Sequence, residues 1–446
     1  MGQYQGYEQY KDSGVEWLGD IPEHWEAVRL KHITNKIIDG AHFTPTYVSE
    51  GIPFLRVTDI VQAGSNSINM NNIKFIPEEE HEALSIRCKP EKGDLLYSKN
   101  GTIGVPRIVD WDFEFSIFVS LCLIKVIKQK ISSEFLQYSL LGKLTETQIN
   151  IGAKSNTVTN LHLDKIKEFW AALPPLEEQD AIAQFLDHKT SQIDALISKK
   201  EALLEKLDEK RTALISHAVT KGLDPTVPMK DSGIEWLGDI PAHWEVLRVK
   251  HLTKILRGKF SHRPRNDPKL YDGEYPFIQT GDVANANKFI TEYSQTLNEN
   301  GYAVSKEFPS GTLVMTIAAN IGDMAILDFN GCFPDSIVGF VPSKQTSVLF
   351  LYYVFTSMRE QFLQTAVLNT QLNLNVERIS NLFTVIAPPE EQGQIIVFLD
   401  KETTNIDQQK AKIKQAIDLL KEYRTALITN AVTGKIDVRQ VPIPQP

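Results

Sequence analysis

The sequence has few cysteines and no long apolar run. Its only cysteines are Cys88, Cys122 and Cys332, which are far apart, lack a CxxC spacing and cannot all pair, so we expect neither a disulfide framework nor a zinc site. The longest apolar-rich run, IFVSLCLIKVI from Ile117, is too short to span a bilayer. The N-terminal stretch MGQYQGYEQYKDSG has no apolar core segment. We therefore expect a cytoplasmic protein with no membrane contact and no bound metal.

The sequence also lacks the motifs that hold a nucleotide or a reacting base. It contains no GxxxxGK[ST] phosphate loop, no GxGxxG or FxGxG loop, and no N/D-P-P-Y/F motif. Pro334-Asp335 followed by VPSK from Val341 resembles a metal-nuclease pattern, but its second carboxylate is absent. We expect no catalytic residues and no cofactor.

Basic residues are not in excess either. The chain has 47 Lys and Arg against 56 Asp and Glu, a formal net charge of −9. This balance argues against a generic nucleic-acid binder, which usually has a basic surface. Residues 35–172 hold 15 basic and 16 acidic side chains, and residues 254–386 hold 11 and 12. Most of the excess acid therefore lies outside these two segments.

What the sequence does contain is an internal duplication. KDSGVEWLGDIPEHWEAVRLKHIT begins at Lys11 and KDSGIEWLGDIPAHWEVLRVKHLT at Lys230, with 18 of 24 positions identical. Likewise, LPPLEEQDAIAQFLDHKTSQID from Leu173 returns as APPEEQGQIIVFLDKETTNID from Ala387. Between these blocks only short stretches correspond, such as PFLRVTD and PFIQTGD. The chain is therefore two halves with a common scaffold and different details.

Each half opens with a block that holds two tryptophans, residues 11–34 and 230–253, here called the Trp blocks. Their D-S-G and D-I-P turns flank bulky apolar residues. We expect each block to dock a globular segment onto a helix, although an ordinary apolar mini-core would have the same sequence. His24 and His243 lack the spacing of metal ligands, so we expect packed structural histidines.

The segments that follow the Trp blocks predict α+β globules. Runs such as SIFVSLCLIKVI, GTLVMTIA and FTVIA are rich in β-branched and aromatic residues and are separated by Gly, Pro and Asn, which is typical of short strands and turns. SSEFLQYSLLGKLTETQ and SVLFLYYVFTSMREQFLQT begin at a possible serine cap and have helical apolar spacing. We expect two α/β globular domains.

A long helix follows each Pro-Pro pair, because proline suits the first turn of a helix. Both helices repeat an apolar position every seven residues, which predicts a coiled coil. An antiparallel pair would place one globular domain at each end and close the chain into a pseudo-twofold, circularly permuted repeat. The predicted seam consists of Leu186, Ile193, Lys200, Leu207 and Leu214 in the first helix and Leu399, Ile406, Ile413, Leu420 and Leu427 in the second.

Lys200 is the one polar residue in this seam, and we expect it opposite Ile413 at the midpoint of the pair. It either fixes the register or extends its ammonium to solvent. The predicted domains are residues 1–172, the first long helix at 173–229, residues 230–386, and the second long helix with its tail at 387–446.

This arrangement closely resembles the DNA specificity subunit of type I restriction-modification enzymes. The similar features are DSGVEWLGDIPEHW and its repeat, IIDGAHFTP followed by GIPFLRVTDI, the pair GDLLYSKNGTIG and GTLVMTIAANIG, and the PPLEEQ and PPEEQ helix starts. The resemblance covers nearly the whole chain. It implies a non-catalytic subunit with two target-recognition domains, each recognising one half of a bipartite double-stranded DNA sequence. It further implies helices that set the spacing and dock methyltransferase subunits, expected to number two, with restriction subunits joining through the complex.

Candidate DNA contacts lie on polar loops between apolar runs. The most basic stretch, RGKFSHRPRNDPK from Arg257, is either a phosphate or base contact or a solvated surface loop. Asn and Gly in the other loops can serve turn geometry alone. The candidates are His42, Thr44, Lys99, Asn100, Thr102, Lys154, Ser155, Asn156 and Thr157 in the first half and Arg257, Lys259, His262, Arg263, Arg265, Thr316, Asn320, Asn369 and Gln371 in the second.

Two other functions stay open at this point. One is a coiled-coil scaffold whose two globular domains bind protein, because divergence between the domains fits two different targets of either kind. The other is a stand-alone DNA-modifying enzyme, against which the absent motifs argue.

Overall fold

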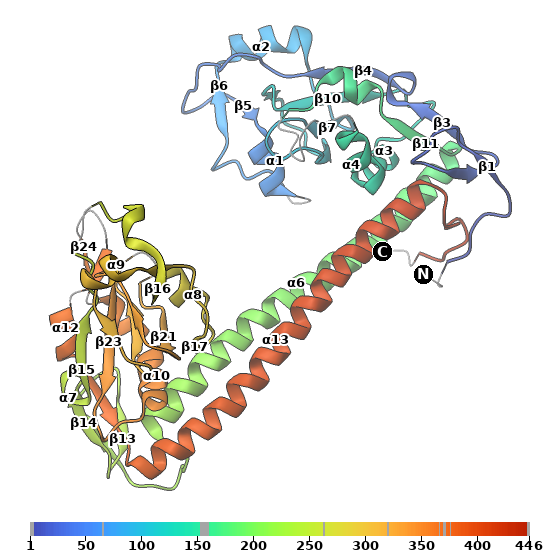
Figure 1. Cartoon of the computed structure of the whole chain (residues 1–446). Helices are drawn as coiled ribbons and strands as arrows, with labels where there is room; N and C mark the ends of the chain where they lie inside the picture. Colours follow the sequence, from blue (N-terminus) through green and yellow to red (C-terminus); the bar gives the residue numbers. More distant parts are fainter. Residues whose placement is uncertain are drawn as a thin grey trace. The chain divides into compact units, whose positions relative to one another are not determined.

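The computed structural model divides the chain into two compact units. Unit 1 consists of Met1–Glu201 and Lys414–Pro446, and unit 2 of Ala202–Ile413. Each unit combines an α+β head with parts of both long helices (Figure 1). We call residues 35–172 head 1 and residues 254–386 head 2. The structure describes residues 4–64, 67–151, 160–261, 264–318, 321–364, 366–368, 372–374 and 376–443.

Head 1 is built on two small sheets. An antiparallel sheet has the order β4-β10-β7-β8, and a second has the order β6-β5-β9, in which β5 and β9 run parallel. Leu96, Leu121 and Leu123 are among the buried residues of its core. The strands are β4 (Thr34–Asp39), β5 (Ile52–Leu55), β6 (Lys74–Ile76), β7 (Leu95–Ser98), β8 (Pro106–Ile108), β9 (Ser116–Ile117) and β10 (Leu121–Val126), and the helices are α1 (Val57–Ala63), α2 (Glu78–Arg87), α3 (Ser133–Leu141), α4 (Lys143–Asn150) and α5 (Leu163–Lys167).

Head 2 repeats the centre of this arrangement. Its largest sheet has the order β15-β23-β20-β21-β17, and its first four strands pair antiparallel, as do β4-β10-β7-β8 of head 1. Short strand pairs β16-β18, β19-β22 and β24-β25 are added to it. Its strands are β15 (Thr253–Arg257), β16 (Tyr271–Pro276), β17 (Phe289–Ile290), β18 (Thr296–Leu297), β19 (Glu307–Phe308), β20 (Leu313–Thr316), β21 (Met324–Leu327), β22 (Gly331–Cys332), β23 (Ile337–Pro342), β24 (Ala366–Leu368) and β25 (Leu372–Leu374), and its helices are η2 (Pro268–Leu270), α8 (Thr280–Asn285), α9 (Glu299–Ala303), α10 (Val348–Ser357), α11 (Arg359–Gln364) and α12 (Val376–Asn381).

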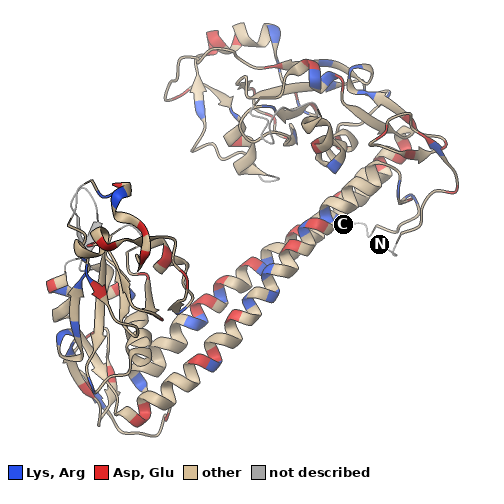
Figure 2. Cartoon of the chain, viewed as in Figure 1, with Lys and Arg blue, Asp and Glu red and all other residues tan. Residues whose placement is uncertain are grey.

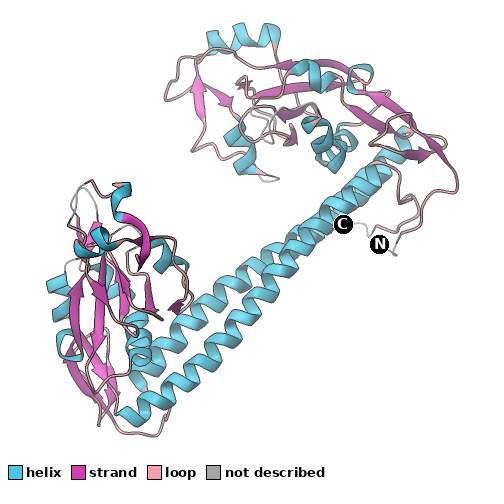
Figure 3. Cartoon of the chain, in the orientation of Figure 1, coloured by secondary structure: helices cyan, strands magenta, loops and turns pink. Residues whose placement is uncertain are grey.

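The Trp blocks and the ends of the heads form matching small sheets. β1 (Tyr10–Asp12) pairs with β2 (Asp20–Pro22), and β12 (Met229–Asp231) with β13 (Asp239–Pro241). Figure 3 shows that strands lie in the heads and Trp blocks, whereas the two long segments at residues 176–221 and 389–432 are helical. The remaining elements are β3 (Glu26–Arg29), which pairs with β11 (Trp170–Leu173), β14 (Glu245–Arg248), which pairs with β26 (Phe383–Ile386), η1 (Leu30–His32) and α7 (Val249–Leu252).

The long helices are α6 (Leu176–Lys221) and α13 (Pro389–Val432). In unit 2, Asp208 pairs with Lys410, and Arg211 pairs with Asp407 at 2.8 Å. Three residues forward along α6 are thus three residues back along α13, which makes the pair antiparallel. Within the described ranges, no helix combines the length and the apolar character needed to cross a membrane.

The register in unit 1 follows from Asp194 and Arg424, whose side chains pair at 2.9 Å. Lys200 lies six residues further along α6 and is therefore level with Asp418, six residues back along α13. The expected partner, Ile413, is five residues from that level, so the predicted midpoint is displaced. Lys200 is half-buried. Along α13, the buried Ile417 is one residue from the position level with Lys200.

The predicted seam positions face inward to different degrees. The buried members are Leu186, Ile193, Leu207, Leu399, Ile406 and Leu427, and the half-buried members are Lys200, Leu214, Ile413 and Leu420.

The Trp blocks dock onto helix ends, as expected. In unit 2, Trp244 is fully buried, and its Nε1 donates to Glu391 of α13 at 3.0 Å. In unit 1, Trp25 is also fully buried, and the Tyr10 hydroxyl donates to the carbonyl of Gly434, just beyond α13, at 3.0 Å. In both units, therefore, a buried tryptophan lies where the Trp block packs against the end of a long helix; we call this place a corner.

The two histidines of the Trp blocks are not packed in the core, contrary to the sequence expectation. His24 pairs with Glu178 at 2.8 Å, and His243 pairs with Glu391 at 2.6 Å. Their side chains are 42% and 43% exposed. They are surface groups that bond to a glutamate in the first turn of a long helix.

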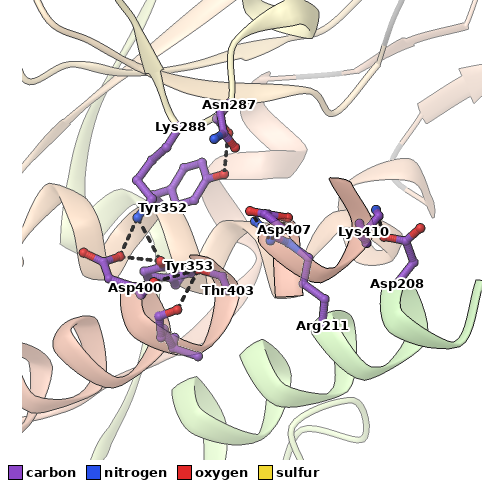
Figure 4. Close-up of polar contacts among 11 residues, drawn as sticks. Asp208, Arg211, Asn287, Lys288, Tyr352, Tyr353, Asp400, Thr403, Asp407 and Lys410 are labelled. Carbon is purple, nitrogen blue, oxygen red and sulfur yellow. Dashed lines mark hydrogen bonds and ion pairs between the residues drawn. The ribbon is translucent and has the colours of Figure 1, made fainter. Parts of the chain in front are cut away.

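Each head is also fixed to a long helix by a buried tyrosine. The Tyr138 hydroxyl donates to Asp187 of α6 at 2.6 Å and lies 3.2 Å from the Thr190 hydroxyl. In head 2, the Tyr353 hydroxyl donates to Asp400 of α13 and lies 3.5 Å from the Thr403 hydroxyl (Figure 4). The two halves therefore use the same triad.

Head 2 adds a cation to this triad. Lys288 Nζ donates to the Tyr353 hydroxyl at 2.9 Å and pairs with Asp400 (Figure 4). Burial would lower the pKa of Lys288, but its hydrogen bonds to Asp400 and Tyr353 outweigh burial and raise it. The lysine therefore stays charged and holds β17 and α10 against α13.

Candidate nucleic-acid interface

A buried carboxylate organises the polar end of β4 in head 1. Asp39 is 3% exposed and faces three cationic or protonatable groups. His42 Nε2 lies 2.9 Å from its Oδ1, Arg87 Nη2 2.6 Å from the same oxygen, and Lys99 Nζ 3.4 Å from Oδ2. Burial would raise the pKa of Asp39, but the hydrogen bonds from His42 and Arg87 outweigh it and lower the pKa. Asp39 thus stays ionised and fixes its neighbours.

These neighbours differ in what they can reach. The Lys99 side chain is buried, so it supports the cluster from within and does not face solvent. The side chains of His42 and Arg87 are 61% and 49% exposed, and Thr44 is exposed. His42 and Arg87 line a cavity of about 300 Å³ between the segment that follows β4, α2 and β9. His42, Thr44 and Arg87 therefore form an exposed polar surface on which a phosphate or base edge could bind.

The predicted loop at residues 99–102 lies beside α1. Gly101 has φ +75°, and a Cβ built on it would lie 3.6 Å from the Val57 side chain. Asn100 is half-buried, whereas Thr102 is exposed. The loop thus presents Thr102 to solvent.

Arg56, directly before α1, is held by Asp59. Its Nε and Nη2 donate to the two Asp59 carboxylate oxygens at 3.1 and 2.9 Å. The Arg56 side chain is 32% exposed, and that of Asp59 is 5% exposed. The guanidinium is therefore fixed on one side and open on the other.

In head 2, the predicted basic stretch is partly neutralised by Asp335. Arg257 Nε donates to the Asp335 carbonyl at 3.0 Å, and Arg265 pairs with its carboxylate. Arg257, Lys259 and Arg265 are all exposed. This surface can contact phosphates, because exposed arginines and lysines suit that role.

A pocket of about 500 Å³ opens next to this stretch. Its aromatic side is formed by Phe260, Tyr271 and Phe277, whose rings lie 5.0 to 6.2 Å apart. The amides of Gln279 and Gln295 also line it, and Gln279 Nε2 donates to Gln295 Oε1 at 2.9 Å. Aromatic faces with nearby amides are suited to binding a planar heterocycle.

Thr316 does not face solvent. It lies at the end of β20, is fully buried, and its Oγ1 accepts from the backbone N–H of Asp323 at 3.2 Å. Several other candidates lie outside the described residues, namely Lys154, Ser155, Asn156, Thr157, His262, Arg263, Asn320, Asn369 and Gln371.

Sequence reasoning did not single out Arg56, Arg87, Gln279 or Gln295. A signal existed for two of them, because PFLRVTD and PFIQTGD align Arg56 with Gln279 in an otherwise similar stretch. No signal connected Arg87 to Asp39, which lies 48 residues away in the chain.

The long helices carry both signs of charge. Figure 2 shows Lys and Arg interspersed with Asp and Glu along α6 and α13. In the described ranges, no group of three His, Cys, Asp or Glu side chains is placed to hold a metal ion.

A family model and individual relatives of this chain all point to the same family. The family described as "Type I restriction modification DNA specificity domain" matches twice, at residues 22–206 and 241–419. A putative type I restriction enzyme MjaX specificity subunit of Methanocaldococcus jannaschii is 26% identical over 95% of this chain and 96% of its own length. The type I restriction enzyme EcoBI specificity subunit of Escherichia coli is 21% identical over 95% of this chain and 89% of its own length.

A solved chain shares the fold. It comes from work on complex assembly and conformational transition of the type I R-M system, and it superposes with a TM-score of 0.71 at 14% identity. The match covers 92% of this chain and 98% of the solved one.

Proposed function

Because the chain belongs to the family of type I restriction-modification DNA specificity subunits, we propose that each of its heads recognises one half of a bipartite double-stranded DNA sequence. A specificity subunit is a DNA-recognition component and not an enzyme. The alternative of a stand-alone DNA-modifying enzyme is therefore dropped.

The observation that carries the proposal is that the contacts between each head and the long helices repeat, whereas the exposed polar groups of the heads do not. The triads Tyr138–Asp187 and Tyr353–Asp400 and the buried Trp25 and Trp244 repeat from one half to the other. The exposed polar groups do not repeat: head 1 has the Asp39 cluster, whereas head 2 has an aromatic pocket lined by amides. A protein that recognised one symmetrical target would have no need of two different surfaces.

The long helices support a role in spacing. α6 is one continuous helix of 46 residues, which is roughly 69 Å at the usual helical rise. Cross-helix ion pairs such as Asp194–Arg424 and Arg211–Asp407 oppose sliding of one helix along the other. We propose that this pair sets the distance between the two half-sites.

We also propose two methyltransferase subunits as partners, with restriction subunits joining through the complex. The chain offers two equivalent corners, each with a Trp block against a helix end. A coiled-coil scaffold whose heads bind protein is the remaining alternative, and the exposed basic groups Arg257, Lys259 and Arg265 favour DNA over it.

The test is selection of DNA from a random library by the subunit together with its methyltransferase partner. We expect the bound sequences to contain two defined half-sites separated by a fixed number of arbitrary bases. Selection of a single uninterrupted site, or of none, would contradict the proposal.

The near-neutral heads give a second expectation. Because they release few counterions, the chain alone should bind DNA weakly at physiological salt. A sequence-specific complex of low nanomolar affinity formed by the isolated chain would contradict this.

A further inference from the structure

One position is placed alike in both heads and differs in chemistry. Arg56 precedes α1, and Gln279 precedes α8. Resting on the proposed function, we propose that this position determines base specificity, with Arg56 recognising a guanine and Gln279, together with Gln295, recognising an adenine.

The turn that begins each helix is held by a backbone hydrogen bond at this position and not by either side chain. The backbone N–H of Arg56 donates to Asp59 at 2.7 Å, and that of Gln279 donates to Asp282 at 2.7 Å. Any residue with an N–H would make this bond. The side chains are therefore free to differ without loss of the turn.

Arg56 has the geometry of an arginine prepared for guanine. Asp59 takes up Nε and one N–H of Nη2, and a guanidinium has five N–H groups in one plane. The edge formed by Nη1 and Nη2 is then available to donate two parallel hydrogen bonds. Guanine presents two acceptors, O6 and N7, at its major-groove edge, and arginine is their usual partner.

The two glutamines of head 2 act as one recognition element. Each amide has a donor and an acceptor group, and one of each is used in the bond between Gln279 and Gln295. One NH2 group and one carbonyl oxygen of the pair therefore stay wholly unused, and this holds whichever amide donates. Adenine presents a donor at N6 and an acceptor at N7, whereas guanine presents two acceptors. The amide pair complements adenine and mismatches guanine.

The surroundings fit this role. Gln279 and Gln295 are half-buried on the wall of the 500 Å³ pocket. Asp272, which also lines the pocket, has φ +62°, the one positive φ among non-glycine residues in the described part of the chain. Such strained backbone is concentrated at ligand-binding sites.

The experiment uses the full subunit with its methyltransferase partner in cells, and it maps methylated sites by sequencing. Arg56→Gln should reduce the preference for guanine at one position of one half-site by roughly 5- to 150-fold. The paired change Gln279→Met with Gln295→Met should reduce the preference for adenine at one position of the other half-site to a similar extent. In both cases the untouched half-site should keep its sequence.

Matched controls remove exposed polar side chains from the same helices. Gln62→Ala on α1 and Asn285→Ala on α8 should leave both half-sites unchanged. Arg56→Lys keeps the charge but replaces the planar fork of donors with one ammonium group, so it should weaken guanine preference less than Arg56→Gln does, while its melting temperature stays near that of the wild type. A guanine preference that Arg56→Gln and Arg56→Lys leave equally unchanged would overturn the assignment.

The inference and the proposed function fail in different ways. Unchanged motifs in Arg56→Gln and in the glutamine pair overturn the inference alone. Altered bases in both half-sites from a change in one head also overturn it. A wild-type complex that assembles and methylates without any defined sequence overturns the proposed function.

Discussion

Head 1 and head 2 are attached to the long helices by the same kinds of contact, but their charged clusters differ in how deeply the central aspartate is buried. In head 1, Asp39 is buried beside the buried Lys99 and pairs with the exposed Arg87 and His42. In head 2, Asp335 is at the surface, and its partners are exposed. Burial makes the first cluster structural as well as polar, whereas the second can change with little effect on folding. The comparison teaches that two duplicated domains can have polar surfaces whose loss affects the free energy of unfolding to different extents.

The largest expected effect concerns the buried tryptophan that each unit has in its Trp block. Trp25→Ala and Trp244→Ala should each cost about 3–5 kcal/mol, because each removes a fully buried indole. Hydrogen exchange on the full chain should lose protection only in the unit that carries the change. Loss of protection in both units from either change would contradict separate cores.

A smaller substitution sharpens this comparison. Trp244→Phe removes the donor of the bond to Glu391, whereas Trp25 Nε1 has no hydrogen-bond partner among the described residues. Trp244→Phe should therefore cost about 1 kcal/mol more than Trp25→Phe. Equal costs in chemical unfolding would show that the Glu391 bond adds nothing.

The next effect separates the two carboxylates. Asp39→Asn leaves the buried Lys99 without its anion and should cost about 3–5 kcal/mol. Asp335→Asn weakens an exposed pair and should cost no more than about 1 kcal/mol. Urea unfolding of both variants measures the difference, and similar costs would refute the contrast between the clusters.

The same carboxylate predicts a dependence on pH. The pKa of Asp39 is below its ordinary value of 3.8 in the folded protein. Its contribution to stability is therefore complete above about pH 4 and is lost as the pH falls through the folded pKa. The stability difference between wild type and Asp39→Asn should narrow below pH 4. A difference that stays constant in acid would contradict an ionised Asp39.

The smallest effect concerns the lysine that only head 2 adds to its triad. Lys288→Met removes the bonds to Asp400 and Tyr353 and should cost about 1 kcal/mol, because the lysine remains partly open to solvent. Tyr138→Phe in head 1 and Tyr353→Phe in head 2 serve as references. If Lys288→Met costs more than Tyr353→Phe, the lysine is the main anchor of head 2.

The repeated frame was predictable because its signals are local or periodic. The Trp blocks recur in sequence, and seam positions such as Ile193 and Ile406 follow a heptad, so two heads and an antiparallel helix pair could be inferred. The predicted register, with Lys200 opposite Ile413, is wrong, because apolar residues still face each other when one helix is shifted along the other. Ion pairs such as Asp194–Arg424 fix the actual register, and such pairs leave no periodic signal.

The recognition surface was predictable only in part. The sequence predicts Lys99 and Thr316 on polar loops between apolar runs, but each lies at a strand end and is buried. Gln279 and Gln295 are 16 residues apart and meet only because β16 and β18 pair. Contacts of this kind depend on tertiary structure, which local sequence patterns do not encode.

The most direct test of the whole account is exchange of residues 254–386 for head 2 of another specificity subunit, followed by mapping of methylated sites in cells that also supply the methyltransferase. We expect one half-site to change to that of the donor, while the other half-site and the intervening length stay the same. A change in both half-sites, or in the length between them, would contradict two independent heads on a common helical frame.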